Sequence, residues 1–182
     1  TNGALHRSEE TYHCFGYEPG AVTPSFELFA QHIDPQDRAM VQAAVQSALE
    51  QGSDYLAEFR FHRADGSARI GRATGRVTRN AQGVPLSMSG AMQDVTVLRQ
   101  SEEQFKVAFR ASPLAASIAR LADGVFIEAN TGYERFFGWS REEMVGHSAL
   151  ELGFWPNAEA RQAWIHELQK TGTVVGYETP LY

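Results

Sequence analysis

The sequence contains an internal repeat, which constrains the fold more than any other feature. The triplet Phe15-Gly16-Tyr17 returns 122 residues later as Phe137-Gly138-Trp139. A short polar and aromatic segment precedes each triplet, and it begins after a good helix-capping residue, Ser8 or Asn130. Because each segment also stops at a glycine, which commonly ends a helix, we predict one short helix at each place. Similar segments at a fixed spacing indicate a repeated architecture.

Two longer helices repeat at nearly the same spacing. Asp34 precedes a predicted helix over residues 36–51, and Asn157 caps one over residues 158–170. These two residues are 123 positions apart, and a glycine follows each helix. On the first helix, apolar residues recur at helical spacing: Met40, Val41, Ala44, Val45, Ala48 and Leu49. Three landmarks in one order predict two copies of one fold, and 182 residues suffice for two small domains.

The first copy continues into three predicted strands, over residues 54–63, 68–79 and 84–97. The segments between them, Ala-Asp-Gly-Ser at 64–67 and Asn-Ala-Gln-Gly at 80–83, are typical of turns that join antiparallel strands. One long helix beside such a meander predicts an α+β domain with helices on one face of the sheet.

A connecting helix is predicted over residues 98–110, before the second copy. Its apolar and small residues follow three- and four-residue spacing, as in a coiled-coil seam: Leu98, Ser101, Phe105 and Ala108. A packed connector helix explains the same pattern. The second copy then has predicted strands over 114–120 and 125–129 and a short helix at 142–145, which a capping box precedes. The segment 173–182 is predicted to be a further strand.

This order of elements, with several sequence segments, resembles the PAS family of sensory domains. The stretches FGYEPG and FFGWSREEMVGHS are similar to the phrase after the family's second strand, and HIDPQDRAMVQAAVQSALEQG is similar to its long helix. The stretch EFRFHRADGSARIGRATGRVTRNAQGVPLSMSGAMQDVT resembles the C-terminal PAS motif, often called PAC, which ends in the signature Asp94-Val95-Thr96. The resemblance implies an α+β PAS fold, whose antiparallel β-sheet is five-stranded when complete and has short helices packed on one face.

The resemblance also implies a domain organisation. Residues 1–97 correspond to a PAS/PAC domain lacking its first strand, and residues 98–112 correspond to a connector, or signalling, helix. Residues 113–182 correspond to the N-terminal part of a second PAS domain, so that the second copy is truncated. We therefore expect this sequence to be part of a longer protein.

For function, the resemblance implies a sensory module of a bacterial signal-transduction protein, a sensor histidine kinase of a two-component system. A small ligand or partner would act on the first domain, and the connector helix would relay the signal to a downstream output domain in the same chain. The alternatives are a ligand-free dimerisation or spacer module and the sensor of a cyclic-dinucleotide synthase (a diguanylate cyclase). We expect a homodimer in the cytoplasm. A membrane anchor elsewhere in the longer parent protein is compatible with this location. No catalytic residue set is found in this sequence.

The sheet of the first copy offers a candidate ligand pocket. Phe59 and Phe61 are expected to point toward the helices. Across the hairpin, the alternation of a strand then places three small residues on the same face: Gly71, Ala73 and Gly75. Small residues leave space there, and the predicted pocket residues are Met40, Phe59, Phe61, Gly71, Ala73 and Met92. A tight contact between helix and sheet is the alternative explanation.

Two further features of the meander concern signalling and partners. Asp94 and Thr96 are the predicted signal junction, where Asp94 would accept hydrogen bonds from Thr96 or a nearby arginine. On the outer face, the same alternation places a row of arginines: Arg60, Arg72 and Arg76. Such a row indicates either an interface for an acidic helix or a second subunit, or a solvated face.

Composition excludes several other classes. The net charge of −6 argues against nucleic acid as a partner, and the single cysteine, Cys14, excludes an internal disulfide. The histidines show no metal-ligand spacing, so no metal site is predicted. No photochemical flavin is expected, because residues 146–150 lack the cysteine that light-sensing relatives carry. Haem is disfavoured, because the first long helix has no histidine and the second has only His166.

Overall fold

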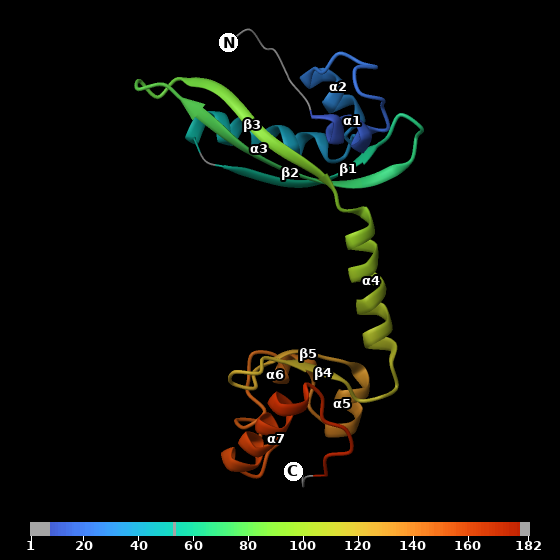
Figure 1. Cartoon of the computed structure of the whole chain (residues 1–182), viewed down its shortest axis with the longest axis vertical. Helices are drawn as coiled ribbons and strands as arrows, with labels where there is room; N and C mark the ends of the chain where they lie inside the picture. Colours follow the sequence, from blue (N-terminus) through green and yellow to red (C-terminus); the bar gives the residue numbers. More distant parts are fainter. Residues whose placement is uncertain (1–7, 53, 179–182) are drawn as a thin grey trace. The chain divides into compact units, whose positions relative to one another are not determined.

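A computed structural model describes residues 8–52 and 54–178. The chain divides into two compact units, Thr1–Glu102 and Glu103–Tyr182, whose boundary falls within one helix, α4 (Figure 1). The elements of the first unit are α1 Glu9–Phe15, α2 Phe26–His32, α3 Arg38–Gln51, β1 Tyr55–His62, β2 Ala68–Arg79, β3 Pro85–Asp94 and the first part of α4 Thr96–Ala111. Those of the second are the rest of α4, β4 Ser117–Ala119, β5 Phe126–Ala129, α5 Thr131–Phe137, α6 Arg141–Met144 and α7 Ala158–Thr171.

The first unit is a helix layer on an antiparallel sheet of order β1-β2-β3. Helices α1, α2 and α3 lie on the same face of this sheet, which we call the inner face (Figure 1). In the register, Phe59 pairs with Gly71, and Ala73 pairs with both Ala57 and Met92. The predicted α+β architecture, the first two strands and their inward-facing residues are therefore confirmed. The third predicted strand, over residues 84–97, is wrong at its end, because β3 stops at Asp94 and α4 begins at Thr96, where the Asp94 carboxylate accepts from the N–H of Thr96.

Aromatic rings form the core between the helices and the sheet. Phe15 at the end of α1 contacts Phe61 of β1 edge to face, with ring centroids 5.3 Å apart. Phe29 of α2 contacts Phe59 in the same way, at 5.7 Å. Each such pair contributes about 0.5–1.5 kcal/mol beyond the area that it buries. Helix α1 ends where predicted because Gly16 adopts the left-handed conformation, with φ 78°.

The edge strand β1 is covered by the segment that leads into α3. Ile33 forms a β-bridge with Phe61, and the backbone N–H of Asp34 donates to the carbonyl of Arg60. This segment also explains why α3 begins at Arg38 and not at residue 36, as predicted. The Asp34 carboxylate accepts from the N–H of Gln36, 3.0 Å away, which forms a local turn in place of a helix cap.

Helix α2 was not predicted from the sequence. Its start is fixed by Ser25, whose hydroxyl accepts a hydrogen bond from the N–H of Leu28 at 3.0 Å. The sequence does contain this signal, because Ser25 follows a proline and precedes Glu27 in the first turn. The helix spans only seven residues, which is too short for a clear apolar periodicity.

The second unit repeats the capping pattern of the first with a smaller core. Asn130 and Asn157 cap α5 and α7, as predicted, by accepting from the N–H groups of Tyr133 and Ala160. The buried residues of its core come from β5, α6 and the loop after it: Phe126, Ala129, Met144, Ala149 and Phe154. Strand β4 is shorter than predicted, with only three residues.

The predicted strand over residues 173–182 is wrong for residues 173–178, which form no strand; residues 179–182 lie outside the described part. A strand requires a hydrogen-bonding neighbour, and within the described residues the sheet of this unit pairs only β4 with β5.

Candidate functional site

The predicted pocket residues converge on the inner face of the sheet, with one exception. Five of them are buried in the core or packed against it: Phe59, Phe61, Gly71, Ala73 and Met92. Met40 is the exception, because it is 44% exposed on α3 and stands outside this core. On the same helix Val41 and Ala48 are buried instead.

The small residues make room for neighbouring side chains of the same chain. A Cβ added to Gly71 would lie 2.8 Å from the terminal methyl of Met92 and 3.3 Å from the rings of Phe59 and Phe61. At Gly75 the added Cβ would lie 2.0 Å from the ring of Tyr55. Burial under this packing raises the pKa of the Tyr55 hydroxyl. Met92 is the adaptable side chain in the packing over Gly71, since a methionine side chain is flexible and fills irregular space.

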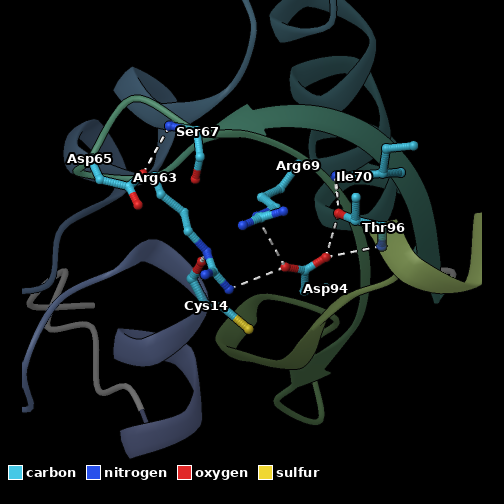
Figure 2. Close-up of polar contacts among 8 residues, drawn as sticks. All are labelled: Cys14, Arg63, Asp65, Ser67, Arg69, Ile70, Asp94 and Thr96. Carbon is cyan, nitrogen blue, oxygen red and sulfur yellow. Dashed lines mark hydrogen bonds and ion pairs between the residues drawn. The ribbon is translucent and has the colours of Figure 1, made fainter. Parts of the chain in front are cut away.

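The predicted signal junction forms a connected set of polar contacts around Asp94 (Figure 2). One carboxylate oxygen of Asp94 accepts from the backbone N–H of Thr96 at 2.9 Å and from its hydroxyl at 2.5 Å. The Thr96 hydroxyl in turn accepts from the N–H of Ile70 at 2.9 Å. The last residue of β3 thus fixes the first turn of α4 against β2. We call Asp94, Thr96 and the arginines described next the inner junction.

Two arginines join the inner junction to the helix layer. The other oxygen of Asp94 lies 3.2 Å from Nη2 of Arg63 and 3.9 Å from Nε of Arg69. The Nε of Arg63 also donates to the carbonyl of Cys14, in the last turn of α1, at 2.9 Å (Figure 2). A single guanidinium therefore connects the C-terminus of α1 to Asp94 at the end of β3. Its positive charge complements the negative end of the α1 dipole.

A second set of charges holds α4 from the opposite, outer face of the sheet. Glu58 of β1 accepts from Nε of Arg72 at 2.8 Å, and from Nε and Nη2 of Arg99 at 3.0 and 2.6 Å. Hydrogen bonds from Arg99 and then Arg72 lower the pKa of the Glu58 carboxyl. Sequence reasoning placed Arg72 on this face but missed Glu58 and Arg99. The pairing of Glu58 with Arg72 follows from strand alternation, whereas nothing in the sequence indicates the contact from α4.

The other arginines of the outer face also have partners within the chain. Arg60 forms an ion pair with Asp37 at 2.6 Å, and Arg76 forms one with Asp54 at 2.7 Å. Next to the latter pair, residues 54–56, 74–76 and 89–90 line an open depression of ≈ 590 Å³. None of the predicted pocket residues lines it.

Over residues 8–52 and 54–178, no three metal-ligating side chains come together in a way that would hold an ion. None of the helices described is both long enough and apolar enough to cross a bilayer.

Known proteins resemble this chain along much of its length. A family profile described as the PAS fold matches residues 4–92. "Sensor protein FixL" of Bradyrhizobium diazoefficiens is 24% identical over 155 residues, which are 81% of this chain and 30% of that protein. The chain thus spans less than a third of this curated relative.

Two solved structures resemble it over about half its length. A sensory box histidine kinase/response regulator from Burkholderia thailandensis is 30% identical, covers 56% of this chain and 75% of its own, and has a TM-score of 0.48. The N-terminal domain of a diguanylate cyclase with PAS/PAC sensor from Marinobacter aquaeolei is 24% identical, covers 50% and 84%, and has a TM-score of 0.46.

The cofactor prediction is wrong. It excluded a photochemical flavin and disfavoured haem because one cysteine phrase and one helix histidine were missing. Similar structures, however, include light-oxygen-voltage domains, one of them studied with a flavin analogue and 22% identical, with a TM-score of 0.39. The curated relative is itself a sensor of the FixL type. The absence of a phrase therefore does not exclude a cofactor, and none is assigned to this chain.

The sheet with helices on one face agrees with the family profile over the residues that the profile matches. Through residues 4–92, this chain belongs to the PAS family.

Proposed function

We propose that this chain is the sensory part of a bacterial signalling protein, in which α4 carries a change in the first unit to a downstream output domain. The observation that carries the proposal is the inner junction, because Asp94 contacts both Arg63, which reaches α1, and Thr96, which starts α4. A histidine kinase is the output that we favour, since the relatives include a sensory box histidine kinase and a FixL sensor.

The input site in this proposal is the inner-face core. A small ligand or a partner would enter between the helices and the sheet, beside Phe59, Phe61 and Ala73, by displacing the flexible Met92 side chain from above Gly71. Met92 lies on β3, two residues before Asp94. A displacement of this strand therefore reaches the inner junction directly, and a ligand biases α4 only to the extent that it binds the two states with different affinities.

The test is the substitution Asp94→Ala in the longer protein that contains these residues. We expect the response of the output domain to its stimulus to be lost, because Thr96 and Arg63 lose their shared acceptor. Asp54→Ala is the matched control, since it removes an exposed carboxylate whose ion-pair partner among the described residues is Arg76, on the outer face. An unchanged response in a folded Asp94→Ala protein would refute the role of the junction.

The domain organisation remains a proposal of the same kind. We propose tandem PAS domains, with residues 1–97 as the first, 98–112 as the signalling helix and 113–182 as part of the second, in a cytoplasmic homodimer. Two exposed apolar side chains on α4, Leu98 and Phe105, are seven residues apart and so share one face of the helix, which supports a dimer contact along it. Concentration-dependent sedimentation that is weakened by Phe105→Glu would support it, and a monomer at all concentrations would oppose it.

A ligand-free assembly module is the second candidate, and one observation favours it. The rings of Phe15, Phe29, Phe59 and Phe61 already pack against one another in the core. Native mass spectrometry of the purified chain separates the two candidates. A retained small molecule supports sensing, whereas a dimer without any bound molecule supports assembly. The sensor of a diguanylate cyclase stays an alternative output, in keeping with the Marinobacter relative.

A further inference from the structure

The first turn of α4 is held from both faces of the sheet. Asp94 pairs with Gly71 in the register and so shares the inner face with the buried core. Glu58 pairs with Arg72 and lies between two buried residues of β1, so its side chain is on the outer face. We call Glu58, Arg72 and Arg99 the outer ion cluster. Together with the inner junction, it fixes the direction in which α4 leaves β3.

Both Glu58 and Arg99 have a second partner of opposite charge. Arg99 donates to Glu58 and, through Nη1, to Glu102 on its own helix at 2.6 Å. Glu58 also pairs with Arg72, at 2.7 Å. Separation of Glu58 from Arg99 therefore leaves neither charge without an opposite charge nearby. All four side chains are between 30% and 40% exposed, so water also solvates the separated groups.

In the inner junction, by contrast, separation leaves a buried group without its partner. When Asp94 releases Thr96, the N–H of Thr96 loses its acceptor, and Thr96 is only 5% exposed. A buried polar group that loses its partner carries a larger penalty than a half-exposed ion pair. The contact between Glu58 and Arg99 is therefore the part of the α4 attachment that separates most readily.

We propose that the pair of Glu58 and Arg99 is a latch whose opening lets α4 change direction while the inner junction stays closed as its pivot. This regulatory role rests on the proposed function, in which α4 carries the signal. In the closed state Arg99 binds the sheet through Glu58, and in the open state it is held by Glu102 within α4. Glu58 and Arg99 are positioning residues, because neither contacts the inner-face core.

Residue-resolved amide hydrogen exchange on the whole 182-residue chain tests the latch. We expect Glu58→Gln to speed exchange of the amides of residues 99–103 by about two- to fivefold, since a half-exposed pair of this kind has a small effect. Arg99→Gln breaks the same contact from the helix side and should give the same change. Asp54→Asn is the matched control, because it breaks an outer-face pair that does not involve α4. Exchange along the β1–β2 ladder serves as the folding check.

A second arm separates a latch from a static support. Gly71→Ala displaces the Met92 methyl on the inner face and so imitates a change in the core. A latch predicts that Gly71→Ala alters α4 exchange in the parent chain but has little further effect once Glu58→Gln has opened the contact. A static support predicts effects that multiply. Unchanged α4 exchange in both latch variants, or multiplying effects, would overturn the proposal. The result does not depend on any sensed ligand, so it stands apart from the Asp94→Ala test of signalling.

Discussion

At the scale of single residues, two glycines on one strand have different roles in the core. The ring of Tyr55 covers Gly75, whereas the movable end of Met92 covers Gly71. We expect Gly75→Ala to destabilise the first unit by about 1–3 kcal/mol, because a stiff ring has to shift. Gly71→Ala should cost less than about 1 kcal/mol, since methionine adapts and alanine restricts the unfolded chain more than glycine. Urea unfolding followed by circular dichroism measures both, and equal losses would contradict this account.

Asp37 shows how one residue ties the edge of the sheet to α3. Its carboxylate accepts hydrogen bonds from the side chain of Arg60 and from the backbone N–H of Arg60, which lower its pKa from 3.8 to about 2. Because the folded pKa lies below the unfolded one, this stabilisation is present above about pH 4 and is lost as the pH falls toward 2.

The substitution Asp37→Asn should therefore remove this acid sensitivity. Since the Arg60 side chain is half exposed, we expect the loss at pH 7 to be only about 1 kcal/mol. The difference between the two proteins should shrink as the pH falls from 4 to 2. Equilibrium unfolding at a series of pH values measures it, and a difference that stays constant down to pH 2 would contradict the assigned pairing.

At the scale of elements, sequence patterns predicted the parts of the fold that depend on local signals. Gly16 and Gly138 end helices where expected, and both have positive φ. The alternation of Phe59 and Phe61 fixed which face of β1 is buried. The start of α3 was misplaced because Asp34 forms a local turn, a choice that depends on the neighbouring strand. Local capping rules do not contain that information.

In the candidate site too, contacts between residues close in the sequence were predictable and contacts between distant residues were not. Asp94 and Thr96 are two residues apart, so their contact was predictable from a short motif. Glu58 and Arg99 are 41 residues apart, and their contact depends on where α4 leaves the sheet. Met40 was expected in the core because it belongs to the same run of apolar residues as Val41. The buried face of α3 is narrower than the face over which apolar residues recur, and Met40 lies outside it. Such a width is decided by packing and not by periodicity.

In the second unit, the side chain of Asn130 connects several elements. It is fully buried, and its carboxamide oxygen accepts from the N–H groups of Ala116 and Tyr133, while its NH₂ donates to the carbonyls of Phe109 and Leu114. Its side chain thus joins the end of α4, the strand β4 region and the start of α5.

We expect Asn130→Ala to destabilise the second unit by about 2–4 kcal/mol, because several buried backbone groups lose their partners at once. Asn157→Ala is the matched control, since Asn157 provides only an exposed helix cap, and its loss should be about 1 kcal/mol. Amide exchange of α5 and α7 reports both variants. Equal effects of the two substitutions would show that Asn130 acts only as a cap.

At the scale of the whole molecule, two separate cores predict two separable unfolding transitions. The first core consists of residues up to 92, and the second consists of residues from 126 onward. All three tryptophans, Trp139, Trp155 and Trp164, belong to the second unit. Tryptophan fluorescence therefore reports that unit alone, whereas far-ultraviolet circular dichroism reports the helices and strands of both.

In urea titrations we expect Gly75→Ala to move the transition seen by circular dichroism and to leave the fluorescence midpoint unchanged. Asn130→Ala should lower the fluorescence midpoint, because its lost contacts lie in the second unit. Coincident shifts by both probes in both variants would mean that the units unfold as one cooperative body. That outcome would contradict a division in which α4 connects two independently stable cores, since each core would then need the other to stay folded.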